Sequence, residues 1–346
     1  MLEELRQCGV CPFRCKVNRL EGKIGKCGCN DKIKIALASL HYYEEPCISG
    51  KNGSGTVFFS NCNFKCIFCQ NYKISQEGKG NEVTIEELAN IFLKLQQEGA
   101  NNINLVTPTM YTYQIIEAIK IARMKGLNLP IIYNSNGYEN VETLRDLRGY
   151  VDVYLPDLKY YADELAIKYS KAPNYFKIAT KAILKMIDQV GLPEFDENGM
   201  IKKGVIIRHL VLPGHIQNSK HILKWLKENV SIMFQDGQLY ALPLIYNIIM
   251  RPIQNKDADE KLVWDLLDKV GIASKIQKLP LTIYTPISNE LDDYGTSFSG
   301  GEMQKILLAR SLANTKLINI YDEVSNAMDV ESKKDAVKLI RKYNKK

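Results

Sequence analysis

The feature that most restricts the fold of this chain is an alternation, from residue 56 onward, of short apolar runs with stretches of helical periodicity. Parallel strands joined by crossover helices produce such an alternation. One helix is predicted over residues 113–125, and another is capped by Thr84, with Glu87 three residues later as in a capping box. The apolar runs predict strands at residues 56–60, 102–107, 130–134, 151–155, 205–212 and 230–234. We therefore expect an α/β fold built on a parallel sheet.

Polar side chains recur at the points where these predicted strands end. In barrels of parallel strands, the carboxyl ends of the strands lie on one side and carry the chemistry. A single Asn or Thr there often serves only as a hydrogen-bonding loop residue, so the recurrence at successive strands is what predicts a site. The residues at these positions are Cys62, Thr107, Thr109, Asn134, Asn136, Asp157, Lys159, His209 and His215.

Three cysteines follow the first of these strands with CxxxCxxC spacing, namely Cys62, Cys66 and Cys69. Three thiolates can hold three irons of a 4Fe–4S cube and leave the fourth iron open to a chelating ligand. The alternative is a zinc knuckle, but zinc usually takes a second pair of ligands, and none follows at the distance typical of zinc fingers. The spacing therefore favours an iron–sulfur cluster with one open iron.

A second group of cysteines precedes the first predicted strand. The spacing of Cys8, Cys11, Cys15 and Cys27 suits zinc or an auxiliary iron–sulfur cluster. This glycine-rich segment has few residues that form a core, so a metal would help it to fold. The alternative is that these thiols are buried or spare. We predict a second metal site here and leave its metal open.

The composition indicates a soluble protein of the cytoplasm. The chain has nine cysteines, and its first residues lack the apolar segment of an export signal, so we expect the thiols in a reducing compartment. No run of 18 apolar residues occurs, which predicts no membrane span. The net charge of +7 is spread along the chain, so we expect no nucleic-acid partner. An exposed iron–sulfur site suggests an anaerobic host.

The glycine-rich run at residues 50–56 is similar to a phosphate-binding loop. The lysine of such a loop is missing, because Thr56 stands in its place. The residues that follow predict a strand, not a helix whose N-terminus would face a phosphate group. We therefore predict that these glycines form the turn into the strand at residues 56–60.

Residues 1 to about 235 resemble the branch of radical S-adenosylmethionine (AdoMet) enzymes that contains pyruvate formate-lyase activating enzyme. The resemblance implies a partial (β/α)6 barrel, a 4Fe–4S cluster on Cys62, Cys66 and Cys69, and bound AdoMet. The segments that carry it are residues 8–15, 45–50, 53–55, 62–71, 106–109, 135–137, 157–159 and 208–214.

The resemblance also implies which side chains contact AdoMet. Phe68 would lie against the adenine, and Asp157 and Lys159 match an Asp-x-Lys pair that contacts AdoMet in activating enzymes. Asn134 and Asn136 are further contacts expected from the third strand. The Gly-Gly-Glu that binds the AdoMet amino group in this family is absent. Thr107 stands in that region and becomes the candidate for this role.

The activity implied by the resemblance is the reductive cleavage of AdoMet to methionine and a 5′-deoxyadenosyl radical, which abstracts hydrogen from a substrate. In activating enzymes that substrate is a glycine Cα–H of a partner protein, a glycyl radical enzyme. The implied partners are therefore a protein substrate and an electron donor of the flavodoxin or ferredoxin type.

The last third of the chain resembles a different family, the ATP-binding domains of ABC transporters. Four segments stand in that family's order: a Q-loop strand, a signature loop, a Walker B strand and a D-loop, at residues 231–236, 299–304, 317–323 and 325–329. The resemblance implies contacts to nucleotide or Mg²⁺ at Gln235, Ser299, Gly301 and Asp322, with Glu323 as the hydrolytic base. No Walker A motif precedes them and no switch histidine follows, so we expect no ATP hydrolysis by this chain alone.

The sequence thus predicts three parts: a cysteine-rich segment at 1–50, a radical AdoMet barrel at 51–235 and a partial ABC nucleotide-binding domain at 236–346. The seam falls at the predicted sixth strand and removes the final segment of the barrel family, which usually gives AdoMet a contact. Two alternatives stay open. One is an ABC transporter ATP-binding subunit that acts with an ABC partner subunit, and the other is a non-functional fusion of two genes.

Overall fold

The computed structural model describes residues 1–233, 239–287, 295–316, 318–321, 335–336 and 338–339. The chain divides into two compact units, Met1–Leu223 and Lys224–Lys346. The finer division predicted from the sequence, with boundaries after residues 50 and 235, stays a prediction.

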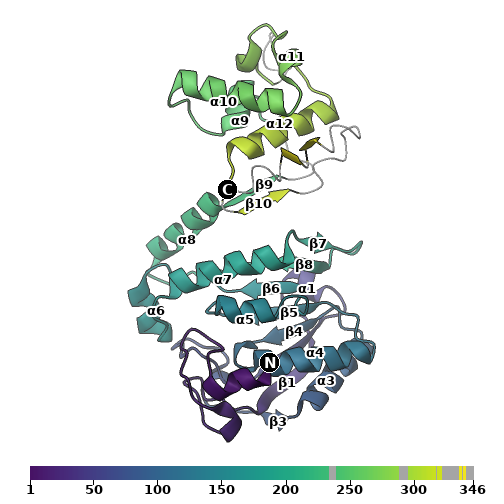
Figure 1. The fold of residues 1–346 in the computed structure, drawn as a ribbon, viewed down its shortest axis with the longest axis vertical. Helices are drawn as coiled ribbons and strands as arrows, with labels where there is room; N and C mark the ends of the chain where they lie inside the picture. The colour runs from purple at the N-terminus through teal and green to yellow at the C-terminus, as the bar shows by residue number, and fades with distance from the viewer. Residues whose placement is uncertain (234–238, 288–294, 317, 322–334, 337, 340–346) are drawn as a thin grey trace. The chain divides into compact units, whose positions relative to one another are not determined.

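An eight-stranded sheet forms the centre of the first unit (Figure 1). The strands are β1 (Ile33–His41), β2 (Ser54–Phe59), β3 (Asn81–Val83), β4 (Ile103–Val106), β5 (Ile131–Ser135), β6 (Val153–Pro156), β7 (Glu194–Phe195) and β8 (Ile201–Val205). Their order is β3-β1-β2-β4-β5-β6-β8-β7. Neighbours from β2 to β8 pair in parallel, whereas β3, β1 and β2 pair antiparallel at one edge and β7 pairs antiparallel at the other. The parallel centre confirms the α/β class expected from the sequence.

Helices connect the parallel strands and cover one face of the sheet (Figure 1). The helical elements of this unit are η1 (Leu2–Gln7), η2 (Arg19–Glu21), α1 (Pro46–Ser49), α2 (Tyr72–Ser75), α3 (Ile85–Gln97), η3 (Thr109–Tyr111), α4 (Thr112–Met124), α5 (Val141–Asp146), α6 (Asp163–Ser170) and α7 (Tyr175–Val190), followed by α8 (Ile216–Asn229). The capping box predicted at Thr84 is confirmed, because its side chain accepts the Glu87 N–H while the Glu87 carboxylate accepts the Thr84 N–H. Both helices predicted from periodicity are present as α3 and α4.

The two faces of the sheet bury different cores because successive strand residues point to opposite sides. On the helix-covered face, Ile103 and Leu105 of β4 belong to the main core together with Phe92 of α3. On the opposite face a smaller apolar cluster forms the interior of the partial barrel. Its buried members are Ile48, Ile132, Val153, Leu155 and Ile201.

The glycine-rich run leads into β2, as predicted. Gly53 has φ +86, a left-handed conformation that favours glycine, and a Cβ at this position would lie 3.0 Å from the Tyr42 ring. The chain continues as a strand from Ser54, so this loop leads into a strand and not into a helix.

Two predicted strands differ from the structure. The strand expected at residues 205–212 is found earlier in the chain, as β8 (Ile201–Val205). Beyond β8, the Ile206 N–H donates to the Tyr154 carbonyl at 2.9 Å, and an isolated bridge joins Asp157 and Arg208. The chain then turns at Gly214, where φ is +76. The run at residues 230–234 does form a strand, β9 (Val230–Met233), but it is not the sixth strand of the barrel sheet, because it pairs with β10 (Ile318–Tyr321) instead.

The second unit combines this parallel pair, β9 and β10, with a helical core. Its helical elements are α9 (Leu244–Ile249), α10 (Lys256–Lys269), α11 (Ala273–Ile276), η4 (Thr282–Tyr284) and α12 (Gly300–Ala313). The predicted signature loop does begin a helix, since Ser299 is the N-cap of α12. The pairing of β9 with β10 joins the predicted Q-loop strand to the predicted Walker B strand.

Among the helices that the structure describes, none is both long enough and apolar enough to span a membrane.

Candidate functional site

The loop after β2 carries the three thiols predicted to bind iron, and it is fastened to the last turn of α6. The Lys65 N–H donates to the Ser170 carbonyl at 3.1 Å, and the Ile67 N–H donates to the Tyr169 carbonyl at 3.0 Å. The Gln76 side chain donates to the Cys66 carbonyl at 2.8 Å. The thiol loop is therefore held by elements outside its own sequence.

The three sulfurs lie close enough for their charges to interact. Charges on Cys66 and Cys69 disfavour the ionised form of Cys62, and burial raises the pKa of the Cys62 thiol to about 12. Burial also raises the pKa of Cys66. Such thiols keep their protons until a metal displaces them, because a coordinating thiol is deprotonated by its metal.

The three cysteines suit an iron–sulfur cluster. A four-iron cube binds its cysteine sulfurs at separate corners, so it does not require them to converge on one point. The Lys159 charge favours ionised Cys62 and Cys66, which suits a group whose three protein ligands are anionic.

Asp157 and Lys159 lie at the end of β6, beside this loop. The Lys159 ammonium and the Asp157 carboxylate form an ion pair. Their side chains are only 15% and 25% exposed, so little water screens the pair. The structure thus brings the predicted Asp-x-Lys pair next to the predicted iron ligands.

Asn136 joins the end of β5 to the thiol loop. Its Nδ2 lies 3.7 Å from the Cys62 sulfur and donates to Asn63 Oδ1 at 2.7 Å. The next residue, Gly137, has φ +76, and a Cβ there would lie 2.3 Å from the Asp157 carbonyl oxygen. Glycine is required at this point because the ends of β5 and β6 approach too closely for any side chain.

Tyr175 holds these two strand ends together and was missed by sequence reasoning. Its hydroxyl lies 2.9 Å from the Asn136 carbonyl oxygen and 2.8 Å from that of Asp157, and it accepts the Lys159 N–H at 3.1 Å. The Tyr175 side chain is fully buried. A tyrosine at the start of a helix belongs to no recognisable motif, so the sequence offers no signal for this role.

Three other predicted AdoMet contacts are placed less tightly. Thr107, at the end of β4, has φ +60, which is uncommon for a β-branched residue, and its N–H donates to the Asn134 carbonyl at 2.9 Å. The Asn134 Oδ1 accepts from Arg208 at 3.5 Å. Phe68 lies on the thiol loop and is 38% exposed. The roles of these three residues in binding AdoMet stay predictions.

An ion-pair network also lies near Asn134 and has no role assigned from the sequence. Arg208 donates to both carboxylate oxygens of Glu45, at 2.7 and 2.6 Å, and pairs with Glu44 as well. The Arg208 guanidinium lowers the pKa of Glu45. Glu45 and Arg208 stand in two of the segments that carry the family resemblance, which is the signal that could have found them.

The two strand-end histidines link loops. Nδ1 of His209 lies 2.6 Å from the Leu158 carbonyl oxygen, so it carries the proton, and Nε2 then accepts from Ser219 at 2.8 Å. The hydrogen bond from His209 holds the backbone of Leu158, the residue between Asp157 and Lys159. Nε2 of His215 lies 3.0 Å from the Tyr169 hydroxyl on α6.

Thr109 turns away from this group and donates to Glu139 at 2.6 Å. Glu139 is 1% exposed, and burial raises its pKa to about 7. The hydroxyls of Ser135 and Tyr133 favour the ionised form but only partly offset the burial. The structure therefore holds a buried carboxyl group that is half protonated near neutral pH.

The N-terminal thiols gather around a buried arginine. The sulfurs of Cys15 and Cys27 lie 3.2 and 3.5 Å from the position of a Cβ on Gly25. Charges on Cys8 and Cys27 act on Cys11. Cys29, which the predicted ligand set omits, also belongs here, because its hydrogen bond with the Cys27 thiol, together with burial, raises the pKa of Cys29.

The arginine at this cluster is Arg19, which is fully buried. It donates to the carbonyls of Met110, at 2.7 Å, and Asn30, at 2.8 Å, and lies 4.0 Å from the Cys8 sulfur. Among the ion pairs of the described residues, none gives Arg19 a carboxylate. The Cys8 sulfur thus lies beside a buried cation.

The nucleotide contacts predicted for the second unit are only partly described. Gly301 lies in the first turn of α12, and the Ser299 hydroxyl accepts the Glu302 N–H at 3.4 Å. Gln235, Asp322 and Glu323 lie outside the described residues.

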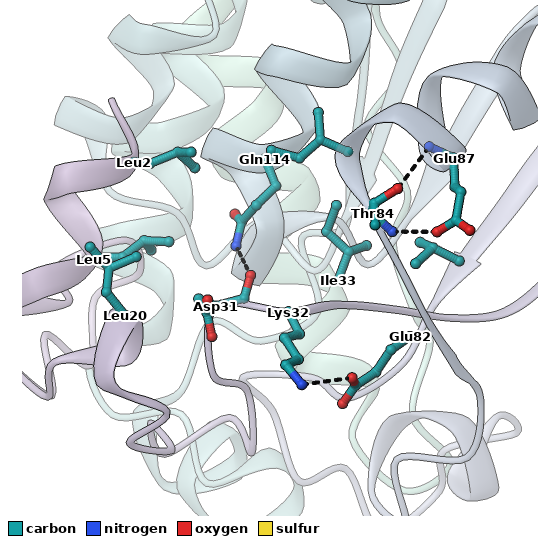
Figure 2. Close-up of a pocket in the computed structure, with 12 residues that line it drawn as sticks. Leu2, Leu5, Leu20, Asp31, Lys32, Ile33, Glu82, Thr84, Glu87 and Gln114 are labelled. Atoms are coloured by element: carbon teal, nitrogen blue, oxygen red, sulfur yellow. Dashed lines mark hydrogen bonds and ion pairs between the residues drawn. The ribbon is translucent and has the colours of Figure 1, made fainter.

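A hollow of about 420 Å³ lies between the N-terminal segment, β3 and the start of α3 (Figure 2). Its lining is largely apolar, with Leu2, Leu5 and Ile33 among the contributors. The Lys32–Glu82 ion pair and the Thr84 capping box border it (Figure 2). It contains none of the residues predicted to bind a cofactor.

Comparison with known proteins gives two kinds of relative. Residues 56–226 match the model of the Radical SAM superfamily. The uncharacterized protein MJ0674 of Methanocaldococcus jannaschii is 34% identical over 248 residues, which are 66% of this chain and 66% of that protein. The methionine import ATP-binding protein MetN of Clostridium tetani is 29% identical over 156 residues, 45% of this chain and 43% of that protein.

A further relative is the glutamate transport ATP-binding protein GluA of Corynebacterium glutamicum, which is 32% identical over 111 residues, 31% of this chain and 40% of that protein. The chain thus spans about two thirds of the archaeal relative and less than half of the two transport proteins.

Proposed function

The chain carries a radical SAM domain at residues 56–226, and we propose that it binds a 4Fe–4S cluster through Cys62, Cys66 and Cys69 with AdoMet beside it. The observation that carries the proposal is the meeting of three chain segments. The thiol loop after β2 comes together with Asn136 from β5 and the Asp157–Lys159 pair from β6.

When bound, this cluster and AdoMet supply a one-electron cleavage that yields a carbon-centred radical able to abstract hydrogen. The residues of the chain would bind the cluster and AdoMet and orient AdoMet. Lys159 is the cation available for the AdoMet carboxylate, and Asp157 holds its ammonium in place. Tyr175 fixes the backbone of both strand ends.

We further propose that the substrate is a protein and that the electron donor is of the flavodoxin or ferredoxin type, as in activating enzymes. Exposed apolar side chains beside the thiols support a docking partner, since Ile67 is 69%, Phe68 38% and Tyr72 50% exposed. A glycine Cα–H on such a partner is the target that the activating-enzyme resemblance suggests.

The test is the EPR spectrum of the reconstituted, dithionite-reduced protein with and without AdoMet. We expect a reduced-cluster signal that changes on adding AdoMet, and loss of that change in Lys159→Met, because the AdoMet carboxylate loses its cation. Lys177→Met, an exposed lysine on α7, is the matched control and should respond like the wild type. A wild-type signal that is indifferent to AdoMet contradicts the proposal.

We propose a second metal at the N-terminal thiols, either zinc or an auxiliary iron–sulfur cluster. The support is the gathering of Cys8, Cys11, Cys15 and Cys27 beside Arg19, whose buried charge calls for an anionic partner. Metal analysis of a Cys62→Ala, Cys66→Ala, Cys69→Ala variant tests this proposal, and the absence of both zinc and iron contradicts it.

A second candidate function belongs to the C-terminal part, which is similar to ABC transporter ATP-binding proteins. The pairing of β9 with β10 and the capped start of α12 support an ATP-linked role shared with a partner subunit. ATP hydrolysis that is lost in Glu323→Gln would support this role. Equal hydrolysis in wild type and variant would contradict it.

A further inference from the structure

Each of the three proposed iron ligands has a hydrogen-bonding group from outside the cysteine residues themselves. Ser170 Oγ lies 2.9 Å from the Cys66 sulfur, and Ser75 Oγ lies 3.1 Å from the Cys69 sulfur. Asn136 Nδ2 lies 3.7 Å from the Cys62 sulfur. The closest of these contacts is made by Ser170, which stands at the end of α6.

Ser170 is itself the second member of a chain of hydroxyl groups. The Tyr160 hydroxyl lies 2.6 Å from Ser170 Oγ. A sulfur that ligates iron is a thiolate and can only accept, so the single proton of Ser170 must point at Cys66. The Ser170 oxygen is then left as an acceptor, and Tyr160 must donate to it. The direction of the chain is therefore fixed, from Tyr160 through Ser170 to Cys66.

Burial makes this chain strong. Ser170 and Tyr160 are both fully buried, so water does not compete for either hydroxyl. Hydrogen bonds to an ionised acceptor are roughly twice as strong as neutral ones, and a low local dielectric strengthens them further. Ser75 is 9% exposed, and among the described contacts no other hydroxyl group donates to it. Its hydrogen bond to Cys69 is therefore the weaker of the two.

We propose that Ser170, with Tyr160 behind it, is a positioning residue that raises the reduction potential of the cluster. The step concerned is the transfer of one electron from the low-potential donor to the cluster, with no proton moved and no bond broken. The added electron increases the negative charge on the sulfurs, so a donor aimed at Cys66 stabilises the reduced form more than the oxidised form. This inference rests on the proposed function, because it requires the cluster to bind at Cys66.

The experiment is a potentiometric EPR titration of the reconstituted full-length protein and three variants. Ser170→Ala removes the donor to sulfur, and Tyr160→Phe removes only the hydroxyl behind it. Ser60→Ala is the matched control, because Ser60 is also fully buried near this loop but donates to the Lys79 carbonyl at 2.6 Å. Iron and sulfide content is measured on each sample.

We expect Ser170→Ala to lower the ratio of reduced to oxidised cluster at a fixed potential roughly threefold to tenfold. For a one-electron couple, a tenfold change corresponds to a midpoint potential that is lower by about 59 mV. Tyr160→Phe should give a smaller shift in the same direction, and Ser60→Ala should give none. If Ser170→Ala does not load iron, the shift in Tyr160→Phe decides.

Equal midpoints in the wild type, Ser170→Ala and Tyr160→Phe overturn this inference and leave the proposed function standing. A shift of the same size in Ser60→Ala also overturns it, because the effect would then follow any change in local packing. A wild-type protein that takes up no iron at Cys62, Cys66 and Cys69 overturns the proposed function itself.

Discussion

The candidate sites of the two units depend on different kinds of contact. In the first unit, contacts between distant parts of the chain define the site, as when Ser170 meets Cys66 across 104 residues and Asn136 meets Cys62 across 74. In the second unit, the described contact of a predicted site residue is local, between Ser299 and Glu302 of one helical turn. A distant contact has to be built by the fold, whereas a capping contact forms in any helix with this sequence.

This difference separates two levels of support for function. The family motifs are recognisable in both units. In the first unit, residues from several strand ends meet around one group of thiols. In the described part of the second unit, the pairing of β9 with β10 brings two of the predicted ABC segments together. Substitutions that disrupt the distant contacts should lower the free energy of unfolding strongly. A substitution that removes the local contact should lower it only modestly.

The largest loss of stability is expected from Gly137→Ala, which disrupts the close approach of the ends of β5 and β6. The new Cβ would meet the Asp157 carbonyl oxygen at 2.3 Å, and alanine disfavours φ +76. We expect the free energy of unfolding to fall by more than about 3 kcal/mol, measured by chemical denaturation. Gly149→Ala is the control, since Gly149 has φ +84 but no atom within 4 Å, and it should cost only about 1 to 2 kcal/mol. Equal losses in both variants would show that no tight approach exists at Gly137.

The next effect concerns the buried Glu139, whose pKa of about 7 in the folded chain lies above its ordinary value of 4.5. Between these two values the folded state keeps a proton that the unfolded state has lost, so stability falls as pH rises from 4.5 to 7. Glu139→Gln removes this loss and should be more stable than the wild type at pH 8 by about 3 kcal/mol.

The measurement for Glu139 is the free energy of unfolding of wild type and Glu139→Gln at pH 5 and pH 8. At pH 5 the difference should be below about 1 kcal/mol, because pH 5 lies only slightly above the ordinary pKa of 4.5, so most of the loss has not yet occurred. Parallel pH profiles for the two proteins would mean that Glu139 is ionised throughout.

The smallest effect is expected in the second unit. Ser299→Ala removes the cap of α12 and should cost about 1 kcal/mol. Both tryptophans of the chain, Trp225 and Trp264, belong to this unit, so their fluorescence follows its unfolding. Ser297→Ala, two residues earlier and exposed, should cost nothing measurable. Equal free energies of unfolding in the wild type and Ser299→Ala would contradict this prediction.

Local signals in the sequence predicted much of the first unit. The alternation of apolar runs located β2, β4, β5 and β6, and the Thr84–Glu87 spacing located the start of α3. The three strands β1, β3 and β7, which pair antiparallel with their neighbours, were not predicted, because the formation of such strands depends on the neighbours that they pair with.

Residues of the candidate site were predicted where they belong to a sequence motif. Residues that reach the site only through the fold were missed. Cys62, Asn136 and Lys159 follow strands and belong to recognisable spacings, and the structure brings them together. Tyr175 and Ser170 act through hydroxyl groups that meet backbone and sulfur atoms far away in the sequence. No periodicity or spacing encodes such a meeting, so these residues emerge only from tertiary structure.

The fastening of the thiol loop to α6 has a consequence for how the protein is made. A ribosome delivers the chain from its N-terminus, so Cys66 leaves the exit tunnel well before Ser170, which follows it by 104 residues. During that interval the cysteines are tethered to a nascent chain that lacks the helix to receive them. If these cysteines bind a cluster as proposed, its complete binding site would form only after Ser170 has been synthesised.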